Sequence, residues 1–372
     1  MKLQEQISAG QLSVVFFIFL TGSSIINIPQ PLIMFARNGS WVSLLISCSI
    51  SLICLSCILY MHNKFPDLTF IEYSRVTVGN WLTFLLAIPF ISFQIHMTSG
   101  IVLDIGLFMT TTMMRETPLY VFNTLIFLLI YVTVRMGIEV IARMFVFLTA
   151  MVMVYVFIIL ILASLKYVPS YLVPVMPYGI KPVLLGAYFS FGFPYVEIFL
   201  FSMLLPFAVK KQNKRLTRGL FIALVLNGLC LVTVTLCTLM TYGPIAADRR
   251  FSMFQIARTI ELYDIIQRIE SLIGISLIVA SYMKATIVLF VLNLTFTHLL
   301  KLQDDRLLIL PLTAICCFLT FNTYARGEAY WANIISVIHP LWGTFGYMVP
   351  VLLVMIVYLI KSKWKNSIAA SK

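Results

Sequence analysis

Charged residues are scarce in this chain of 372 residues: they make up 11% of it, whereas hydrophobic residues make up 61%. A water-soluble domain carries about 25% charged residues, because its surface faces water. The scarcity therefore excludes a soluble globular protein, a disordered chain and a disulfide-rich secreted scaffold. The chain also lacks the strict alternation of apolar and polar residues, in segments of about ten, that is typical of a membrane β-barrel.

The common motifs of catalysis are missing as well. The chain has no HExxH, GxSxG or Walker sequence, which mark metalloproteases, serine hydrolases and nucleotide-binding enzymes. The four histidines are far apart in the order of the predicted spans: His62, His96, His298 and His339. We therefore expect neither enzyme activity nor a cofactor or metal.

Seven cysteines, an odd number, all fall inside apolar runs. Cys54 and Cys57 form a CxxC, but inside an apolar helix this pattern favours small packing residues over a redox or zinc site. We expect no disulfides. The net charge of +12 comes from residues scattered through the connections between apolar runs, which favours a role in membrane orientation over binding of nucleic acid.

What the chain does have is a series of apolar stretches of about 20 residues, the length that crosses a hydrocarbon core of ~30 Å as a helix. They predict a multi-pass helical membrane protein with no cleavable targeting segment. A surplus of Lys and Arg on one side, most of it from Lys210 to Arg218, predicts that both termini are cytoplasmic. The ten predicted spans are 11–35, 41–61, 80–110, 117–135, 141–164, 182–207, 217–242, 266–300, 306–323 and 335–360.

Two of these spans are interrupted. The first contains Thr21-Gly22-Ser23-Ser24 before Pro29, and the sixth contains Ser190-Phe191-Gly192-Phe193-Pro194 before Glu197. Because glycine lowers helix propensity and proline removes a donor, each helix is expected to break near mid-membrane. A simple kink is the alternative for either motif alone. At positions one and six of ten, however, the breaks correspond in two five-helix halves, which points to a midplane substrate site as in LeuT.

The chain resembles the B subunits of spore germinant receptors, which are spore germination permeases within the amino acid–polyamine–organocation superfamily. The resemblance covers nearly the whole sequence, although Asn38-Gly39-Ser40 replaces a more acidic turn and Ala285-Thr286 replaces Ile-Ser. The stretches that carry it are Ile7-Ser8, Gln11-Leu12, Pro29, 36–41 (ARNGSW), 135–143 (RMGIEVIAR), 268–272 (RIESL) and 282–286 (YMKAT).

This resemblance implies an all-α, LeuT-like membrane domain over residues 1–372, built as a 5+5 inverted repeat of 1–164 and 182–360 with a basic cytoplasmic tail, 361–372. It implies a location in the inner spore membrane and a complex with an A and a C subunit. The implied role is sensing of a small nutrient such as an amino acid. The alternatives are a proton-coupled amino acid transporter with the same pocket and a channel or scaffold subunit of a larger pore.

An amino acid brings a carboxylate and an ammonium group, and both need partners when they leave water. The half-helix after a break offers N–H groups to the carboxylate, and the end of the preceding half offers carbonyls to the ammonium. The residues predicted to bind the carboxylate are Gly22, Ser23 and Ser24. Those predicted to give carbonyl contacts and to shape the side-chain pocket are Ser190, Phe191 and Gly192, with Thr98 beside them. Phe193 is expected either to close over the ligand or to pack.

Lys284 lies near the middle of the eighth span, where an ammonium costs ~2.5–3.5 kcal/mol on insertion scales. It needs a partner, and Asp104 and Glu197 are the possible ones. One interpretation makes it a tethered cation with a structural role, in the place where LeuT-like proteins hold sodium, and the other makes it a proton-coupling group. His96 is a proton relay or a packing residue.

Two further segments carry charge patterns. Arg135, Glu139 and Arg143 have i, i+4 spacing, which predicts a cytoplasmic ion-pair cluster that acts as a brace, a gate or a subunit contact. The connection 243–265 mixes aromatic, aliphatic and charged residues. It predicts an amphipathic helix at the membrane interface, either as a lid or partner surface or as an anchor.

Overall fold

The computed structural model describes residues 5–260 and 269–370. Within these ranges the regular secondary structure is helical, apart from a single isolated β-bridge between Ile7 and Ala208. Eight helical segments are long and apolar enough to cross a membrane, and two shorter apolar helices bring the described spans to ten. The prediction of an all-α multi-pass membrane protein is therefore confirmed. Arg268 of the 268–272 motif and residues 261–265 of the long connection lie outside the described residues.

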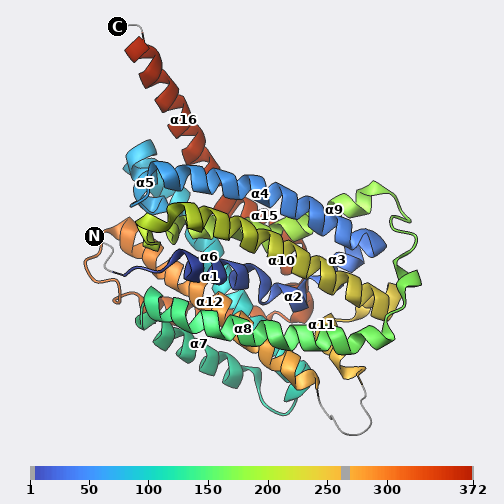
Figure 1. Cartoon of the computed structure of the whole chain (residues 1–372). Coiled ribbons are helices and arrows are strands. Elements are labelled where there is room, and N and C mark those ends of the chain that lie inside the picture. Colours follow the sequence, from blue (N-terminus) through green and yellow to red (C-terminus); the bar gives the residue numbers. More distant parts are fainter. Residues whose placement is uncertain (1–4, 261–268, 371–372) are drawn as a thin grey trace.

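The helices run side by side along one axis of the molecule (Figure 1). Two short helices, α5 (Phe70–Val78) and α11 (Ser252–Arg258), lie between spans. The spans in chain order are α1–α3 (Ala9–Ala36), α4 (Ser40–Lys64), α6 (Asn80–Phe108), α7 (Leu119–Arg135), α8 (Ile138–Ala163), α9 with η5 (Ile180–Met203), α10 (Asn213–Tyr242), α12 (Glu270–Leu300), α13 (Ile309–Ala325) and α14–α16 (Glu328–Ala370).

The first, sixth and eighth spans form the core. Helix α1 (Ala9–Thr21) packs against α8, α10 and α12, and every residue of η5 (Tyr195–Met203) is buried. A helix that is apolar on all sides is buried in protein rather than half-exposed, and this accounts for the central position of these three spans. The two helix breaks are thereby held away from the outer surface.

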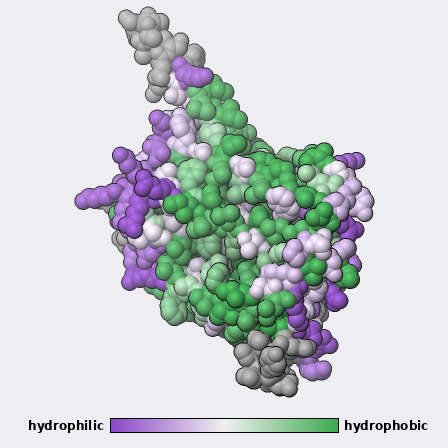
Figure 2. Space-filling model, turned by 45° about the vertical axis from the view of Figure 1, so that its right-hand side comes forward, coloured by the Kyte–Doolittle hydropathy of each residue, from purple (hydrophilic) through white to green (hydrophobic). Residues whose placement is uncertain are grey.

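The outer surface is apolar where the spans face outward. Figure 2 shows a broad hydrophobic face that separates two hydrophilic ends. Exposed large side chains of the spans include Leu125 and Leu128 of α7 and Phe147 and Phe157 of α8. Such a surface is expected for helices whose solvent is lipid. The last helix, α16 (Val349–Ala370), extends out of the bundle at one end (Figure 1).

The connection 243–265 differs from the predicted interfacial helix over its described part, 243–260. It forms a 3-10 turn, η8 (Gly243–Asp248), and the short helix α11. Helix α11 packs on α10 and α12 and buries Met253, Phe254 and Ile256. Phe254 meets the ring of Phe108 edge-on, with 5.2 Å between centroids. The apolar side chains of α11 therefore face protein, so that α11 covers one end of the core.

Candidate functional site

The first span breaks directly after Thr21. Helix α1 ends there, Gly22 and Ser23 form a turn, and helix resumes as α2 (Ser24–Asn27) and α3 (Pro29–Ala36). Gly22 is required by a close approach to α12, because an added Cβ would lie 2.9 Å from the Cβ of Ala280. Gly22 thus packs against α12 and does not face open space.

The sixth span breaks after Gly192, where α9 (Ile180–Gly192) ends and Phe193-Pro194 leads into η5. A Cβ at Gly192 would lie 2.3 Å from the Cα of Pro340, so this glycine sits tightly against the last span. Ser190 also points into protein, and its hydroxyl lies 2.8 Å from that of Ser47. The break is thus built by packing against α4 and α15 (His339–Gly343).

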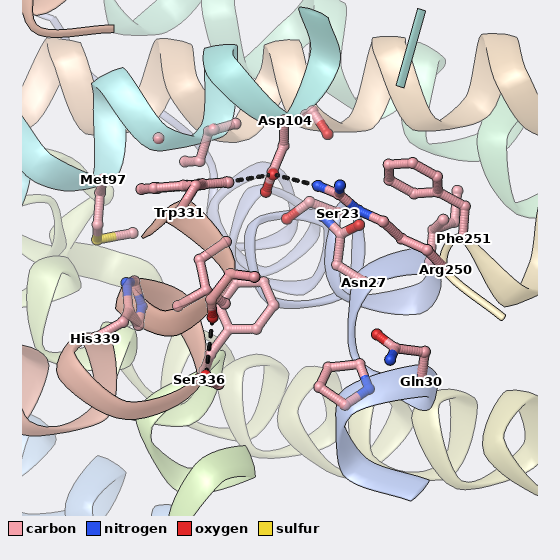
Figure 3. A pocket seen from close by; sticks show the side chains of 18 of the residues that line it. Ser23, Asn27, Gln30, Met97, Asp104, Arg250, Phe251, Trp331, Ser336 and His339 are labelled. Atoms are coloured by element: carbon pink, nitrogen blue, oxygen red, sulfur yellow. Dashed lines mark hydrogen bonds and ion pairs between the residues drawn. The ribbon is translucent and has the colours of Figure 1, made fainter. Parts of the chain in front are cut away.

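A cavity of about 360 Å³ lies between the two breaks. Figure 3 shows that side chains from the first span, α6 and the last span converge on it. It is referred to below as the central cavity. Its polar and charged lining residues are Ser23, Asn27, Gln30, His96, Asp104, Glu197, Arg250, Ser281, Asn333, Ser336 and His339, and its aromatic ones are Phe193, Phe251 and Trp331.

Five of the predicted candidates line the central cavity: Ser23, His96, Asp104, Phe193 and Glu197. Ser24 is buried and lies outside the lining, and the hydroxyl of Thr98 donates to the carbonyl of Gln94, 2.9 Å away in its own helix. The other residues predicted for the pocket also lie outside the lining. They are Gly22, Ser190, Phe191, Gly192 and Lys284.

Sequence reasoning missed Asn27 and Gln30, although a signal was present. They follow Ser23 at i+4 and i+7, the spacing of one helix face, and all three line the cavity. The residues that the last span contributes to the cavity lining could not be recognised from a spacing of this kind. Ser336 lies in a π-helical turn, Ile334–Ile338, and His339 follows it, and local departures of this kind are common at functional sites.

Asp104 closes one side of the cavity. Its Oδ1 accepts a hydrogen bond from Trp331 Nε1 at 2.8 Å and lies 3.8 Å from Arg250 NH2, as Figure 3 shows. Arg250 also reaches Glu328, at 3.5 Å. This cluster joins α6, the segment before α11 and α14 (Glu328–Asn333). Asp104 is therefore engaged at the cavity mouth and is not the direct partner of Lys284.

The partner of Lys284 is Glu197. Lys284 Nζ lies 2.6 Å from Glu197 Oε2, and neither side chain is exposed. The ammonium also lies over the ring of Phe193, 4.4 Å from its centroid, a favourable cation–π position. Glu197, which follows the second break, thus forms an ion pair with α12.

The predicted cluster of Arg135, Glu139 and Arg143 is only partly assembled. Arg143 NH2 lies 3.0 Å from Glu139 Oε2, and Glu139 also accepts from the backbone N–H of Gln6 at 2.9 Å. Arg135 instead donates to Tyr131. It ends α7, and Gly137, with φ +86°, separates it from α8, so the three side chains do not share one helix face.

Comparison with known proteins places the chain in a family. A family model described as Spore germination protein matches residues 6–326. The chain belongs to this family. Spore germination protein KB of Bacillus subtilis (strain 168) is 25% identical over 311 residues, which is 82% of each chain. Spore germination protein XB of Bacillus anthracis is 22% identical over 341 residues, or 91% of this chain and 94% of the relative.

Solved structures share the fold. A substrate-bound, outward-open Na⁺-coupled sialic acid symporter matches 94% of this chain and 80% of its own, with a TM-score of 0.69 and 11% identity. MhsT in complex with L-phenylalanine matches 95% of this chain and 99% of its own, with a TM-score of 0.68 and 14% identity. The predicted LeuT-like 5+5 inverted repeat with broken first and sixth spans is confirmed. The repeat limits, 1–164 and 182–360, stay a prediction.

Proposed function

We propose that this chain is the nutrient-binding membrane subunit of a spore germinant receptor, and that it binds a small zwitterion such as an amino acid in the central cavity. Membership in the spore germination protein family supports the role in germination. The observation that carries the binding proposal is the position of the cavity, which has residues of both broken spans in its lining. The proposal places the chain in the inner spore membrane with both termini cytoplasmic.

The chemistry of the lining suits a zwitterion. Ser23 opens the half-helix α2, whose N-terminal end favours a carboxylate, and Asn27 and Gln30 add side-chain amides. Asp104 and Glu197 offer carboxylates to an ammonium group, while Phe193 and Trp331 supply apolar surface. The cavity, at about 360 Å³, lies within the size range of small-molecule sites. MhsT, which has the same fold, was solved with L-phenylalanine.

Signalling requires that the ligand bind one conformation of the chain more tightly than another. A preference of ~10⁴-fold moves a balance of 1:99 to 99:1. The family resemblance implies A and C subunits, and these would respond to the change in conformation. The salt bridge between Arg143 and Glu139 and the exposed Ile356 and Ile360 of α16 lie at the bundle surface, where such partners have access.

The second candidate is a proton-coupled amino acid transporter that uses the same cavity. The position of Lys284 favours the transporter. Its buried ammonium lies on α12 next to the first break, where a cation could couple substrate binding to proton movement. The fold is shared with a Na⁺-coupled symporter.

One pair of measurements separates the two functions. Equilibrium binding of a panel of radiolabelled L-amino acids to the purified full chain in nanodiscs tests the site, and counterflow of the same amino acids in proteoliposomes tests transport. The receptor proposal predicts saturable binding without counterflow. Robust exchange would favour the transporter, and absence of saturable binding for every amino acid in the panel would contradict both.

A further inference from the structure

A row of four buried or half-buried titratable side chains crosses the core from α12 to α6. Lys284 Nζ lies 2.6 Å from Glu197 Oε2, Glu197 Oε1 lies 3.5 Å from His339 Nε2, and His339 Nδ1 lies 3.1 Å from His96 Nε2. Each residue comes from a different span. Neither the proposed nutrient site nor the packing of the core requires two histidines in line with a carboxylate.

His96 connects this row to a second cavity. A cavity of about 730 Å³, referred to below as the lateral cavity, lies between α6, α12, α13 and the last span. His96 lines both it and the central cavity. The polar residues of the lateral cavity are Ser92, His96, Ser99, Asn322, Thr323, Arg326 and Tyr330. His96 is thus a titratable group in the lining of both cavities.

Hydrogen-bonding rules fix the direction of the row. A neutral imidazole has one N–H donor and one acceptor nitrogen. When Glu197 is ionised, His339 Nε2 carries the proton that faces the carboxylate, so His339 Nδ1 is an acceptor. His96 Nε2 must then donate to it, and this leaves His96 Nδ1 as the acceptor at the far end. The charge of Glu197 thereby sets the tautomers of two histidines.

We propose that His96, His339 and Glu197 form a proton relay, which delivers one proton from the lateral cavity to the carboxylate that is paired with Lys284. A proton binds His96 Nδ1, the Nε2 proton of His96 moves to His339 Nδ1, and the Nε2 proton of His339 moves to Glu197 Oε1. One proton enters and one is held as a carboxylic acid, and Lys284 keeps its own. The ligand of this site is a proton, so the inference goes beyond nutrient binding.

Aromatic side chains hold the two imidazoles in place. The His96 ring stacks on Trp342 with 4.5 Å between centroids, and the His339 ring lies between Phe93, at 5.0 Å, and Phe193, at 5.7 Å. The step from His339 to Glu197, at 3.5 Å, is longer than a formed hydrogen bond. The His339 ring must therefore move toward the Glu197 carboxylate before the proton is transferred. This movement makes the transfer from His339 to Glu197 the slow step of the relay.

Other titratable groups surround the relay. Tyr347 faces Glu197 from the last span, and Asp104 and Arg250 lie at the mouth of the central cavity. Arg326 and Tyr330 lie in the lateral cavity. Asp104 already accepts from Trp331 and contacts Arg250, so Glu197 is the carboxylate in contact with His339. Protonation of Glu197 removes the negative charge that ties η5 to Lys284 on α12.

A pH jump on the full chain in nanodiscs, followed by time-resolved infrared spectroscopy, tests the relay. Acidification should produce the C=O stretch of a protonated carboxyl group that Glu197→Gln lacks. In His96→Asn the same band should form at least tenfold more slowly and reach the same amplitude. His62→Asn, which changes a histidine on α4 outside the row, should keep the rate of the unsubstituted chain. An unchanged rate in His96→Asn, or no band that depends on Glu197, would overturn the proposal.

A measurement on the unsubstituted chain keeps the test valid if Glu197→Gln does not fold. Only four histidines are present, so ¹⁵N-histidine labelling gives four imidazoles to assign. A nitrogen–nitrogen coupling across the hydrogen bond between His96 and His339 is expected, with His96 as the donor. At a pH at which Glu197 is ionised, protonation of His339 Nδ1 while Nε2 is bare would contradict the relay.

Discussion

Lys284 Nζ and Glu197 Oε2 lie 2.6 Å apart at the centre of the bundle, with no exposed surface on either side chain. The contact joins α12 to the half of the sixth span that follows its break. An uncompensated buried charge is strongly destabilising, so loss of either charge makes the remaining one costly in this place. The ion pair therefore couples the protonation of one residue to the packing of two core spans.

Removal of one partner should destabilise the fold. Lys284→Met is expected to lower the free energy of unfolding by about 3–5 kcal/mol, because it leaves the Glu197 carboxylate unpaired. The double variant Lys284→Met/Glu197→Gln should recover most of this loss in thermal unfolding of the detergent-solubilised chain.

The matched control is Lys210→Met. Lys210 pairs with Asp67 at the same distance, 2.6 Å, but at side-chain exposures of 66% and 55%. Its loss should cost no more than about 1 kcal/mol. An equal loss in the single and double variants at positions 284 and 197 would contradict the coupling.

Gly22→Ala tests the first break. The added methyl group would lie 2.9 Å from Ala280 Cβ and from the Ile18 carbonyl, and overpacking of this kind typically costs about 1–3 kcal/mol. We expect lower thermal stability together with weaker amino acid binding, through displacement of α1 from α12. Gly10→Ala is the control, since an added Cβ there meets no described atom within 4 Å. Equal behaviour of the two variants would argue against the close approach.

The sequence predicted the ten spans and the two breaks because hydropathy and the Gly and Pro punctuation are local properties. It also narrowed the partner of Lys284 to Asp104 and Glu197. It did not predict which residues around each break face the cavity. The sequence offers no reason to prefer Ser23 over Gly22 or Ser190 as a lining residue. Gly22 packs against Ala280, and Ser190 packs against Ser47. These contacts depend on how α12 and α4 dock, which the sequence does not reveal.

The roles of His96 and His339 show the same limit. Their contact at 3.1 Å joins residues 243 positions apart, and it depends on how the last span folds back onto α6. The π-helical turn Ile334–Ile338 sets the position of His339. No periodicity in the sequence indicates such a turn.

Glu72 gives the chain an acid-sensitive contact outside the spans. Burial raises the pKa of its carboxyl, but hydrogen bonds and charge from His298 and hydrogen bonds from Thr69 outweigh burial and lower the pKa to about 2. Since the pKa is depressed in the folded state, the stabilisation is present above the ordinary value of 4.5 and is lost as pH falls from there toward 2.

Glu72→Gln should therefore be less stable than the unsubstituted chain at pH 7, by about 3 kcal/mol, and the difference should disappear toward pH 2. Glutamine keeps the capping box with Thr69, so the change isolates the charge. Thermal unfolding across this pH range measures the effect, with the exposed Glu116→Gln as control. A difference that is independent of pH would rule out the ionised carboxylate as its source.

Arg250 should restrict access to the central cavity, since it bridges Asp104 and Glu328 at the mouth. In a Ser23→Cys background, Arg250→Ala is expected to increase the rate of modification by a water-soluble thiol reagent several-fold. Arg326→Ala removes an arginine whose contact is with Tyr330 and should leave the rate unchanged. The same acceleration in both variants would show that access does not depend on the mouth cluster.

The most direct test of the account is a cryo-EM map of the full chain, bound to a rigid antibody fragment and saturated with the amino acid that binds best in the nanodisc assay. The account predicts new density for a small molecule in the central cavity, in contact with Ser23 on one broken span and Phe193 on the other. Density at another place, or a central cavity that stays unchanged at saturating ligand, would contradict it.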